Sequence, residues 1–260
     1  MADYDAIVVG AGHNGLAAAL TLAKGGLKVL VLEKQRYVGG MAGTTEFFKG
    51  FKHNVGAWAL MVKTRNITQA LELDKHGLEV IDPPTSFCTF GEPGDVPYIL
   101  YNDLARLRQH LSEDHGDQAV QSLAGLYEIT RTFAMAIGSA GYKLPKSLGA
   151  MMDGMPTVQA KDTMRRFLFD SAAEMIGDFF PEPAKNRVIQ ASLAAMAIDG
   201  TGVGPYSLGT AWSLGLHIGP VAAGVHYRLV KGGMGMFSEA MRKGFEEKGG
   251  EVKLTTPVDR

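Results

Sequence analysis

The sequence predicts an α/β fold in which a βαβ unit opens the chain and a mostly helical α+β region is inserted after it. Residues 5–9 form a short apolar run, as expected of a parallel strand buried on both faces. A glycine turn at residues 10–15 leads into small, helix-forming residues that end at Gly25 and Gly26. Residues 28–33 supply the second strand, so the elements follow in the order of a Rossmann-like unit.

The glycine turn reads GxGxxG, and each glycine has a physical task. Gly10 permits the tight turn, Gly12 lets the backbone approach a pyrophosphate, and Gly15 lets the helix pack close to the strand. Glu33 ends the second strand, where a carboxylate accepts ribose hydroxyls and disfavours the 2′-phosphate of NADP. The predicted cofactor-binding residues here are Gly10, Ala11, Gly12, His13, Asn14, Gly15, Glu33 and Lys34.

A second glycine motif at residues 36–44 separates FAD from NAD. It resembles the RxGGRxxS/T extension that follows the second strand in flavoproteins of the amine-oxidase and phytoene-desaturase type. Its backbone N–H groups would reach the diphosphate from the other side, although Met41 replaces the second arginine. A plain hairpin turn at Gly39 and Gly40 is the alternative. The predicted FAD-binding residues of this motif are Arg36, Gly39, Gly40, Met41, Ala42 and Thr44.

The segment at residues 50–58 follows, and in the same flavoproteins the matching segment passes beside the isoalloxazine ring. The resemblance therefore implies that Gly56 and Ala57 lie near a flavin. His53 is either a general base or a structural histidine, and hydride transfer does not always need a base. No catalytic residue is assigned.

Residues 64–227 are predicted to form a substrate or cap region, with apolar residues at helical spacing and short strands at 80–81 and 98–101. The glycine-rich residues 200–224 are interpreted as active-site loops. The FAD-binding domain is predicted to comprise residues 1–63 and 228–260, because residues 230–241 lead into a helix and residues 251–256 into a third Rossmann strand.

Four segments together resemble bacterial phytoene-desaturase-like FAD oxidoreductases and the pyridine-nucleotide-disulphide-oxidoreductase-domain family: GAGHNGLAAAL, RYVGGMAGT, VKGGMGMFSEAM and GGEVKLTTPVDR. The resemblance implies that Val258 touches the adenine through its backbone. It also implies further chain beyond Arg260, so the FAD-binding domain is expected to be incomplete and the isolated chain not competent in catalysis. A natural split protein would give the same pattern.

Composition narrows the other classes of function. The 26 basic and 27 acidic residues give a net charge of −1, which argues against a nucleic-acid partner. Cys88 is the only cysteine, which excludes disulfide redox catalysis, and we expect it to be a small buried hydrophobe with no metal site. The absence of a targeting segment predicts a cytoplasmic protein, with peripheral membrane contact left open.

The leading hypothesis is an FAD-dependent oxidoreductase that desaturates an apolar isoprenoid or carotenoid-like substrate by hydride transfer to flavin N5. An FAD amine or amino-acid oxidase has the same cofactor domain and stays an alternative. So do a non-catalytic lipid- or protein-binding module like the Rab GDP-dissociation inhibitors, and an NAD dehydrogenase that would leave Gly39 and Gly40 unexplained. The substrate, electron acceptor and oligomeric state are not predicted.

Overall fold

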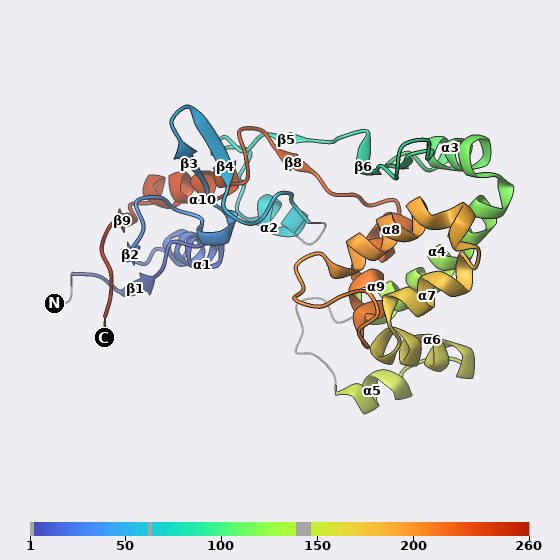
Figure 1. Ribbon diagram of the computed structural model, residues 1–260. Helices are drawn as coiled ribbons and strands as arrows, with labels where there is room; N and C mark the ends of the chain where they lie inside the picture. Colours follow the sequence, from blue (N-terminus) through green and yellow to red (C-terminus); the bar gives the residue numbers. More distant parts are fainter. Residues whose placement is uncertain (1–2, 62–63, 139–146, 260) are drawn as a thin grey trace. The chain divides into compact units, whose positions relative to one another are not determined.

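The computed structural model describes residues 3–61, 64–138 and 147–259 (Figure 1). The chain forms two compact units. The first comprises residues 1–83 and 227–260, and the second comprises residues 84–226. The first unit therefore includes residues 64–83, which the sequence pattern groups with the substrate region; that functional division stays a prediction.

A three-stranded parallel sheet forms the centre of the first unit, in the order β1 (Ala6–Val9), β2 (Val29–Leu32), β9 (Glu251–Lys253). Ala6 pairs with Val29 and Leu30 pairs with Glu251, which fixes the register. Helices α1 (His13–Lys24) and α10 (Gly235–Glu247) pack against each other and against the sheet. The predicted βαβ unit and the third Rossmann strand are confirmed.

The core of the first unit lies between the sheet and these two helices. Leu16 and Ala19 of α1 are fully buried, as are Val31 of β2 and Phe245 of α10. This apolar layer holds the carboxyl ends of the strands in place beside the start of α1. Burial of apolar side chains such as these is the main source of the unit's stability.

Strand β1 differs from the expectation of burial on both faces. Ile7 is 59% exposed and Val9 is 64% exposed, so only one face of β1 is covered. The reason is its place at the edge of the sheet, where its outward side chains have fewer neighbours. The central strand β2 is the one that is buried on both faces, since Leu30 and Val31 point in opposite directions and both are buried.

The first unit also contains smaller elements that follow β2. They are the short 3₁₀ helix η1 (Gly40–Ala42), the hairpin of β3 (Thr44–Phe48) and β4 (Phe51–Asn54), helix α2 (Thr64–Ala70), and the antiparallel pair of β5 (Val80–Ile81) with β8 (Leu229–Val230).

The second unit is mostly helical, as predicted. A hairpin of β6 (Thr85–Thr89) and β7 (Tyr98–Tyr101) precedes its helices. The helices are α3 (Leu104–His115), α4 (Asp117–Gly138), α5 (Leu148–Asp153), α6 (Val158–Phe169), α7 (Ala172–Phe179), α8 (Pro183–Ile198) and α9 (Thr210–Ala222). None of the helices in the described ranges is both long and apolar enough to cross a bilayer.

Local sequence signals explain several helix starts in this unit. Asp103 caps α3 by accepting a hydrogen bond from the N–H of Arg106, and Thr157 caps α6 in the same way. Ser171 and Glu174 form a reciprocal capping box at α7. These caps satisfy backbone donors that would otherwise have no partner at the first turn.

Two expectations about the second unit are wrong. Residues 210–222 of the glycine-rich stretch form α9 rather than a loop, because Gly215 and Gly219 let this helix pack tightly. A Cβ at Gly215 would lie 2.6 Å from the ring of Phe133. Cys88 lies in β6 and is exposed, because it points away from the face of the hairpin that the helices cover.

Candidate nucleotide-binding site

The turn between β1 and α1 has the geometry that its glycines predict. Gly10 has a φ of 99°, a left-handed conformation that favours glycine, and its N–H donates to the carbonyl of Leu32 at 2.7 Å. A Cβ at Gly15 would lie 2.1 Å from the carbonyl oxygen of Gly10, so the helix can lie this close only without a side chain there. A Cβ at Gly12 would meet nothing within 4 Å. The surface of Gly12 is therefore open to a ligand.

Helix α1 presents an uncapped N-terminus at this turn. Gly12 is its N-cap residue, no side chain caps it, and its first turn has no acidic residue. The first N–H groups of a helix have no partner within the helix, and the helix dipole places partial positive charge there. His13 and Asn14 are exposed at this end. The arrangement is suited to bind an anion such as a diphosphate.

Glu33 lies at the carboxyl end of β2 with 8% of its surface exposed. Its Oε2 accepts a hydrogen bond from the N–H of Ala11 at 2.7 Å, and its Oε1 accepts one from the N–H of Gln35 at 2.8 Å. A carboxylate has about four acceptor positions, so both oxygens keep capacity for a further donor. Glu33 is thus fixed beside the glycine turn, where the sequence predicts a ribose.

The second glycine motif lies directly against the first. The N–H of Gly39 donates to the carbonyl of Ala11 at 2.7 Å, and a Cβ at Gly40 would be 3.5 Å from the Cα of Gly12. Both Gly39 and Gly40 have positive φ angles, 105° and 55°. They join β2 to η1 rather than two paired strands, so the alternative of a plain hairpin turn is wrong.

Thr44 connects this motif to α10. Its hydroxyl accepts a hydrogen bond from the N–H of Gly235 at 2.7 Å and donates one to Oδ1 of Asn54 at 2.8 Å. The same Asn54 oxygen accepts from the N–H of Met234 at 2.9 Å. The single hydroxyl proton of Thr44 is therefore already donated within the protein, which makes a structural role its first function.

Gly56 and Ala57 lie beside Met41. The N–H of Ala57 donates to the carbonyl of Met41 at 2.8 Å, and a Cβ at Gly56 would lie 2.2 Å from the Cε of Met41. Met41 is 64% exposed, whereas Ala42 is buried beneath it. The structure thus brings together the predicted diphosphate and isoalloxazine segments.

Other predicted residues lie at the margin of the site. Lys34 and Arg36 are exposed, and neither has an ion-pair partner in the described part of the chain. Val258 is 45% exposed and follows Thr256, whose N–H donates to the carbonyl of Glu33 at 2.8 Å. The end of the chain is therefore held next to Glu33.

His53 is on the outer part of the hairpin. It is exposed and lies beside the ring of Phe47, 6.1 Å between the centroids. The structure does not bring it to the glycine loops, so its assignment as a base gains no support.

The sequence analysis missed three residues that complete the site. Asn54 holds the N-terminus of α10 through Met234, and Ser238 is fully buried with its hydroxyl directed at the carbonyl of Ala42, 3.4 Å away. A Cβ at Gly235 would lie 2.6 Å from the N atom of Thr44. The signal in the sequence was the run of glycines at 232–235 before a helix, which marks a close approach of backbones.

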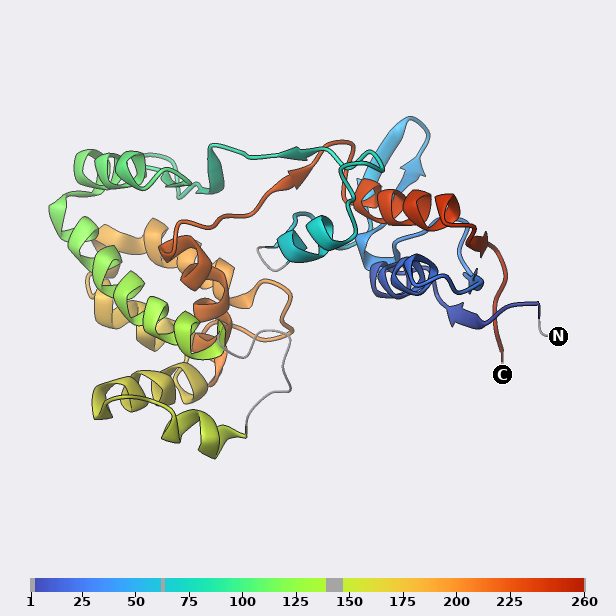
Figure 2. The same ribbon diagram turned by 180° about the vertical axis from the view of Figure 1, so that it is seen from behind.

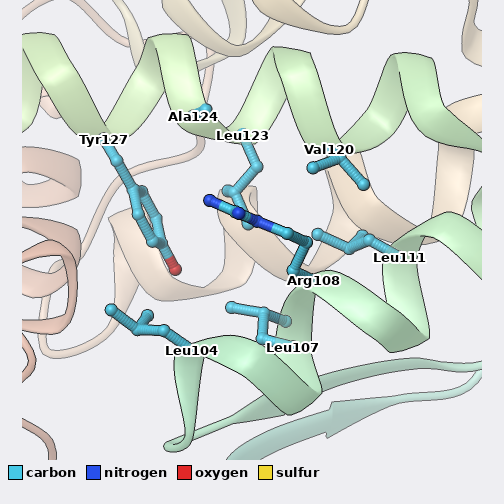
Figure 3. Close-up of a pocket in the computed structure, with 8 residues that line it drawn as sticks. All are labelled: Leu104, Leu107, Arg108, Leu111, Val120, Leu123, Ala124 and Tyr127. Carbon is cyan, nitrogen blue, oxygen red and sulfur yellow. The ribbon is translucent and has the colours of Figure 1, made fainter.

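A separate hollow lies in the second unit between α3 and α4 (Figure 3). Its volume is about 110 Å³, and Figure 3 shows Arg108 and Tyr127 directed into it from the two helices. Burial raises the pKa of the Tyr127 phenol, which therefore stays neutral. Ligand sites usually have volumes of about 300–1,000 Å³, so this hollow is too small for a whole substrate. Its lining is completed by Leu104, Leu107, Leu111, Val120, Leu123 and Ala124.

A larger hollow of about 400 Å³ lies beside α10 in the first unit. Its lining is largely charged, and Arg242 pairs there with Glu246 at 2.9 Å and with Glu239 at 3.7 Å. These charges satisfy one another, so the hollow is poorly suited to a charged ligand. Neither hollow competes with the glycine loops as the candidate site.

The fold and the two glycine loops define a nucleotide-binding protein of the Rossmann type. Residues 8–72 match the family model described as NAD(P)-binding Rossmann-like domain. The chain is 27% identical over 273 residues to pyridine nucleotide-disulfide oxidoreductase domain-containing protein 2 of Rattus norvegicus, in an alignment that covers 96% of this chain and 47% of the rat protein. The predicted resemblance to this group is confirmed.

Shorter matches point to proteins of isoprenoid chemistry. One limonene dehydrogenase polypeptide of Castellaniella defragrans is 30% identical over 146 residues, 52% of this chain and 26% of that protein. Prolycopene isomerase of Daucus carota is 38% identical over 106 residues, 39% of this chain and 17% of that protein.

Solved structures show the same fold. A triple mutant of putrescine oxidase superposes with a TM-score of 0.57 at 19% identity, covering 98% of this chain and 51% of that chain. Rab GDI from Plasmodium falciparum gives a TM-score of 0.53 at 13% identity, covering 99% and 59%. The chain spans about half the length of the proteins that it matches along its whole course. At these identities the structural matches show the fold alone.

Proposed function

We propose that this chain supplies the FAD-binding half of a flavin-dependent oxidoreductase. The observation that carries the proposal is the contact of the two glycine loops, in which the N–H of Gly39 donates to the carbonyl of Ala11 while Glu33 accepts from the N–H of the same residue. A single glycine loop suffices for NAD. The second loop, held against the first, is what an FAD diphosphate would need on its other side.

The residues present fit FAD. The open surface at Gly12 and the uncapped start of α1 would receive the diphosphate, and Glu33 would receive the ribose hydroxyls. Gly56 and Ala57 would lie toward the isoalloxazine ring, and the backbone of Val258 toward the adenine. The remaining proposed contacts are those of Gly10, His13, Asn14, Gly15, Lys34, Arg36, Gly39, Gly40, Met41, Ala42 and Thr44.

The proposed reaction is desaturation of an apolar isoprenoid or carotenoid-like substrate. When bound, the flavin would supply the hydride acceptor, N5, and the protein would orient the substrate and exclude water. The similarity to proteins named for limonene and prolycopene supports this substrate class. Residues 64–227 would contribute to the substrate region, and a cytoplasmic location goes with the proposal.

An amine or amino-acid oxidase is the second candidate, favoured by the shared fold with putrescine oxidase. The two candidates differ in the substrate, because an amine needs a polar or aromatic recognition site and an isoprenoid needs an apolar one. Reduction of the bound flavin under anaerobic conditions by putrescine, by an amino acid or by a carotenoid precursor would separate them.

The proposal is tested by flavin retention. The protein is incubated with FAD and desalted, and its visible spectrum is recorded beside that of the Gly12→Val variant. We expect a flavin spectrum that the variant loses, because a valine side chain occupies the open surface at Gly12. Matched incubation with NAD⁺ is the control. Retention of NAD⁺ in place of FAD, or equal retention of FAD by both proteins, would contradict the proposal.

A further inference from the structure

The hairpin of β3 and β4 carries three exposed phenylalanines at its turn. Phe47, Phe48 and Phe51 have 57%, 73% and 65% of their surface exposed, and together they are called the phenylalanine tip. Figures 1 and 2 show the turn of this hairpin projecting from the body of the first unit. Single exposed apolar residues are ordinary, but a cluster of large ones marks an interaction surface.

The turn that presents the tip has a defined conformation. Phe48 pairs with Phe51 across the hairpin, and Gly50 has a φ of 85° at the bend. The N–H of Gly50 donates to Oε1 of Glu46 at 2.7 Å, which closes the turn. The aromatic rings are therefore held outward by backbone structure, and the ordering cost of presenting them is met before any partner binds.

Two cations accompany the rings. Lys49 and Lys52 are exposed, and neither has an ion-pair partner among residues 3–61, 64–138 and 147–259. The carboxylate of Glu46, in the same hairpin, accepts the Gly50 N–H. A protein interface of ordinary composition is depleted in lysine, whereas rings flanked by lysines suit a bilayer, where the rings enter the acyl boundary and the ammonium groups meet anionic headgroups.

We propose that the phenylalanine tip, with Lys49 and Lys52, docks the protein on the surface of an anionic lipid bilayer. The rings of Phe48 and Phe51, the two most exposed of the three, would insert most deeply. This inference goes beyond the proposed function and does not depend on flavin. It would bring the protein to the phase in which apolar molecules dissolve.

Vesicle co-sedimentation without added flavin measures this binding. We expect the protein to bind vesicles of phosphatidylcholine with phosphatidylserine more tightly than phosphatidylcholine alone, and less tightly at high salt. The double variant Phe48→Ser/Phe51→Ser should lower the partition coefficient at least about tenfold. Lys49→Gln/Lys52→Gln should lower it about tenfold on the anionic vesicles and leave binding to phosphatidylcholine unchanged.

Phe90→Ser is the matched control, because Phe90 is 76% exposed but belongs to the second unit. It should bind as the unchanged protein does. Circular dichroism and thermal unfolding of each variant show that the fold is kept, as expected for substitutions of exposed side chains.

A local probe reports whether the tip itself enters the bilayer. An environment-sensitive dye on Lys49→Cys, in a Cys88→Ser background, should shift to the blue with anionic vesicles, and a dye on Cys88 should not. The proposal is overturned if the protein binds neither kind of vesicle, or if the tip variants bind as well as the control. It is also overturned if the tip variants instead convert a dimer into monomers, since the tip would then bind a second copy.

Discussion

The carboxylate of Glu33 accepts a hydrogen bond from the backbone N–H of Ala11 at 2.7 Å, which joins the end of β2 to the glycine loop. Ala11 is fully buried, so this N–H has no access to water. The carbonyl of Ala11 in turn accepts from the N–H of Gly39. One residue of the first loop is thus fixed by Glu33 on one side and by the second loop on the other.

The first prediction concerns this hydrogen bond. Glu33→Ala leaves the buried N–H of Ala11 without a partner, so the free energy of unfolding should fall by about 1–3 kcal/mol. Urea denaturation measures the change. Lys34→Ala, at the exposed next residue, should leave stability within about 0.5 kcal/mol of the unchanged protein. An unchanged midpoint for Glu33→Ala would show that the carboxylate serves ligand binding alone.

The second prediction separates two glycines of one motif. Gly15→Ala places a Cβ 2.1 Å from the carbonyl oxygen of Gly10, so the helix must move and stability should fall by about 1–3 kcal/mol. Gly12→Ala has no neighbour within 4 Å and a φ of −66°, so it should unfold like the unchanged protein.

Flavin titration completes that comparison. Gly12→Ala should weaken FAD binding although it leaves the fold intact, because its methyl group stands where the diphosphate approaches. If Gly15→Ala were as stable as the unchanged protein, the close packing of α1 on the Gly10 turn would be disproved.

The glycine loops could be predicted from sequence because their geometry is set by residues close along the chain. The role of Thr44 could not, since its partner Gly235 is 191 residues away and no local pattern joins them. Residues 210–222 were mistaken for a loop because glycine indicates either a turn or a tight contact. The 2.6 Å approach of Gly215 to Phe133 is visible only once α4 and α9 are packed.

The third prediction tests whether Thr44 is structural. Thr44→Val keeps the shape but removes the acceptor for the N–H of Gly235 and the donor to Asn54, so the free energy of unfolding should fall by about 1–3 kcal/mol. Thr44→Ser retains the hydroxyl and should recover most of the loss. A Thr44→Val variant of unchanged stability but weakened FAD binding would instead assign the hydroxyl to the phosphate.

The fourth prediction is a pH dependence at Asp95 in the second unit. Nε of Arg187 donates to Oδ1 of Asp95 at 3.1 Å, and Nη1 of Arg187 lies 3.6 Å from the carboxylate of Glu92. The Arg187 guanidinium lowers the pKa of Asp95 below its ordinary value of 3.8. A carboxyl whose pKa is lower in the folded state stabilises the fold above its unfolded pKa, and this stabilisation is lost as the pH falls through the folded-state pKa.

Thermal unfolding of the unchanged protein and of Arg187→Gln checks this sign. The unchanged protein should have the higher midpoint at pH 6, and the difference should shrink as the pH falls from about 5 to below the folded-state pKa. In an Asp95→Asn background the arginine substitution should have a smaller effect with little pH dependence, because residue 95 no longer titrates and only Glu92 remains. A difference that grows on acidification would mean that Arg187 stabilises the fold through contacts other than these carboxylates.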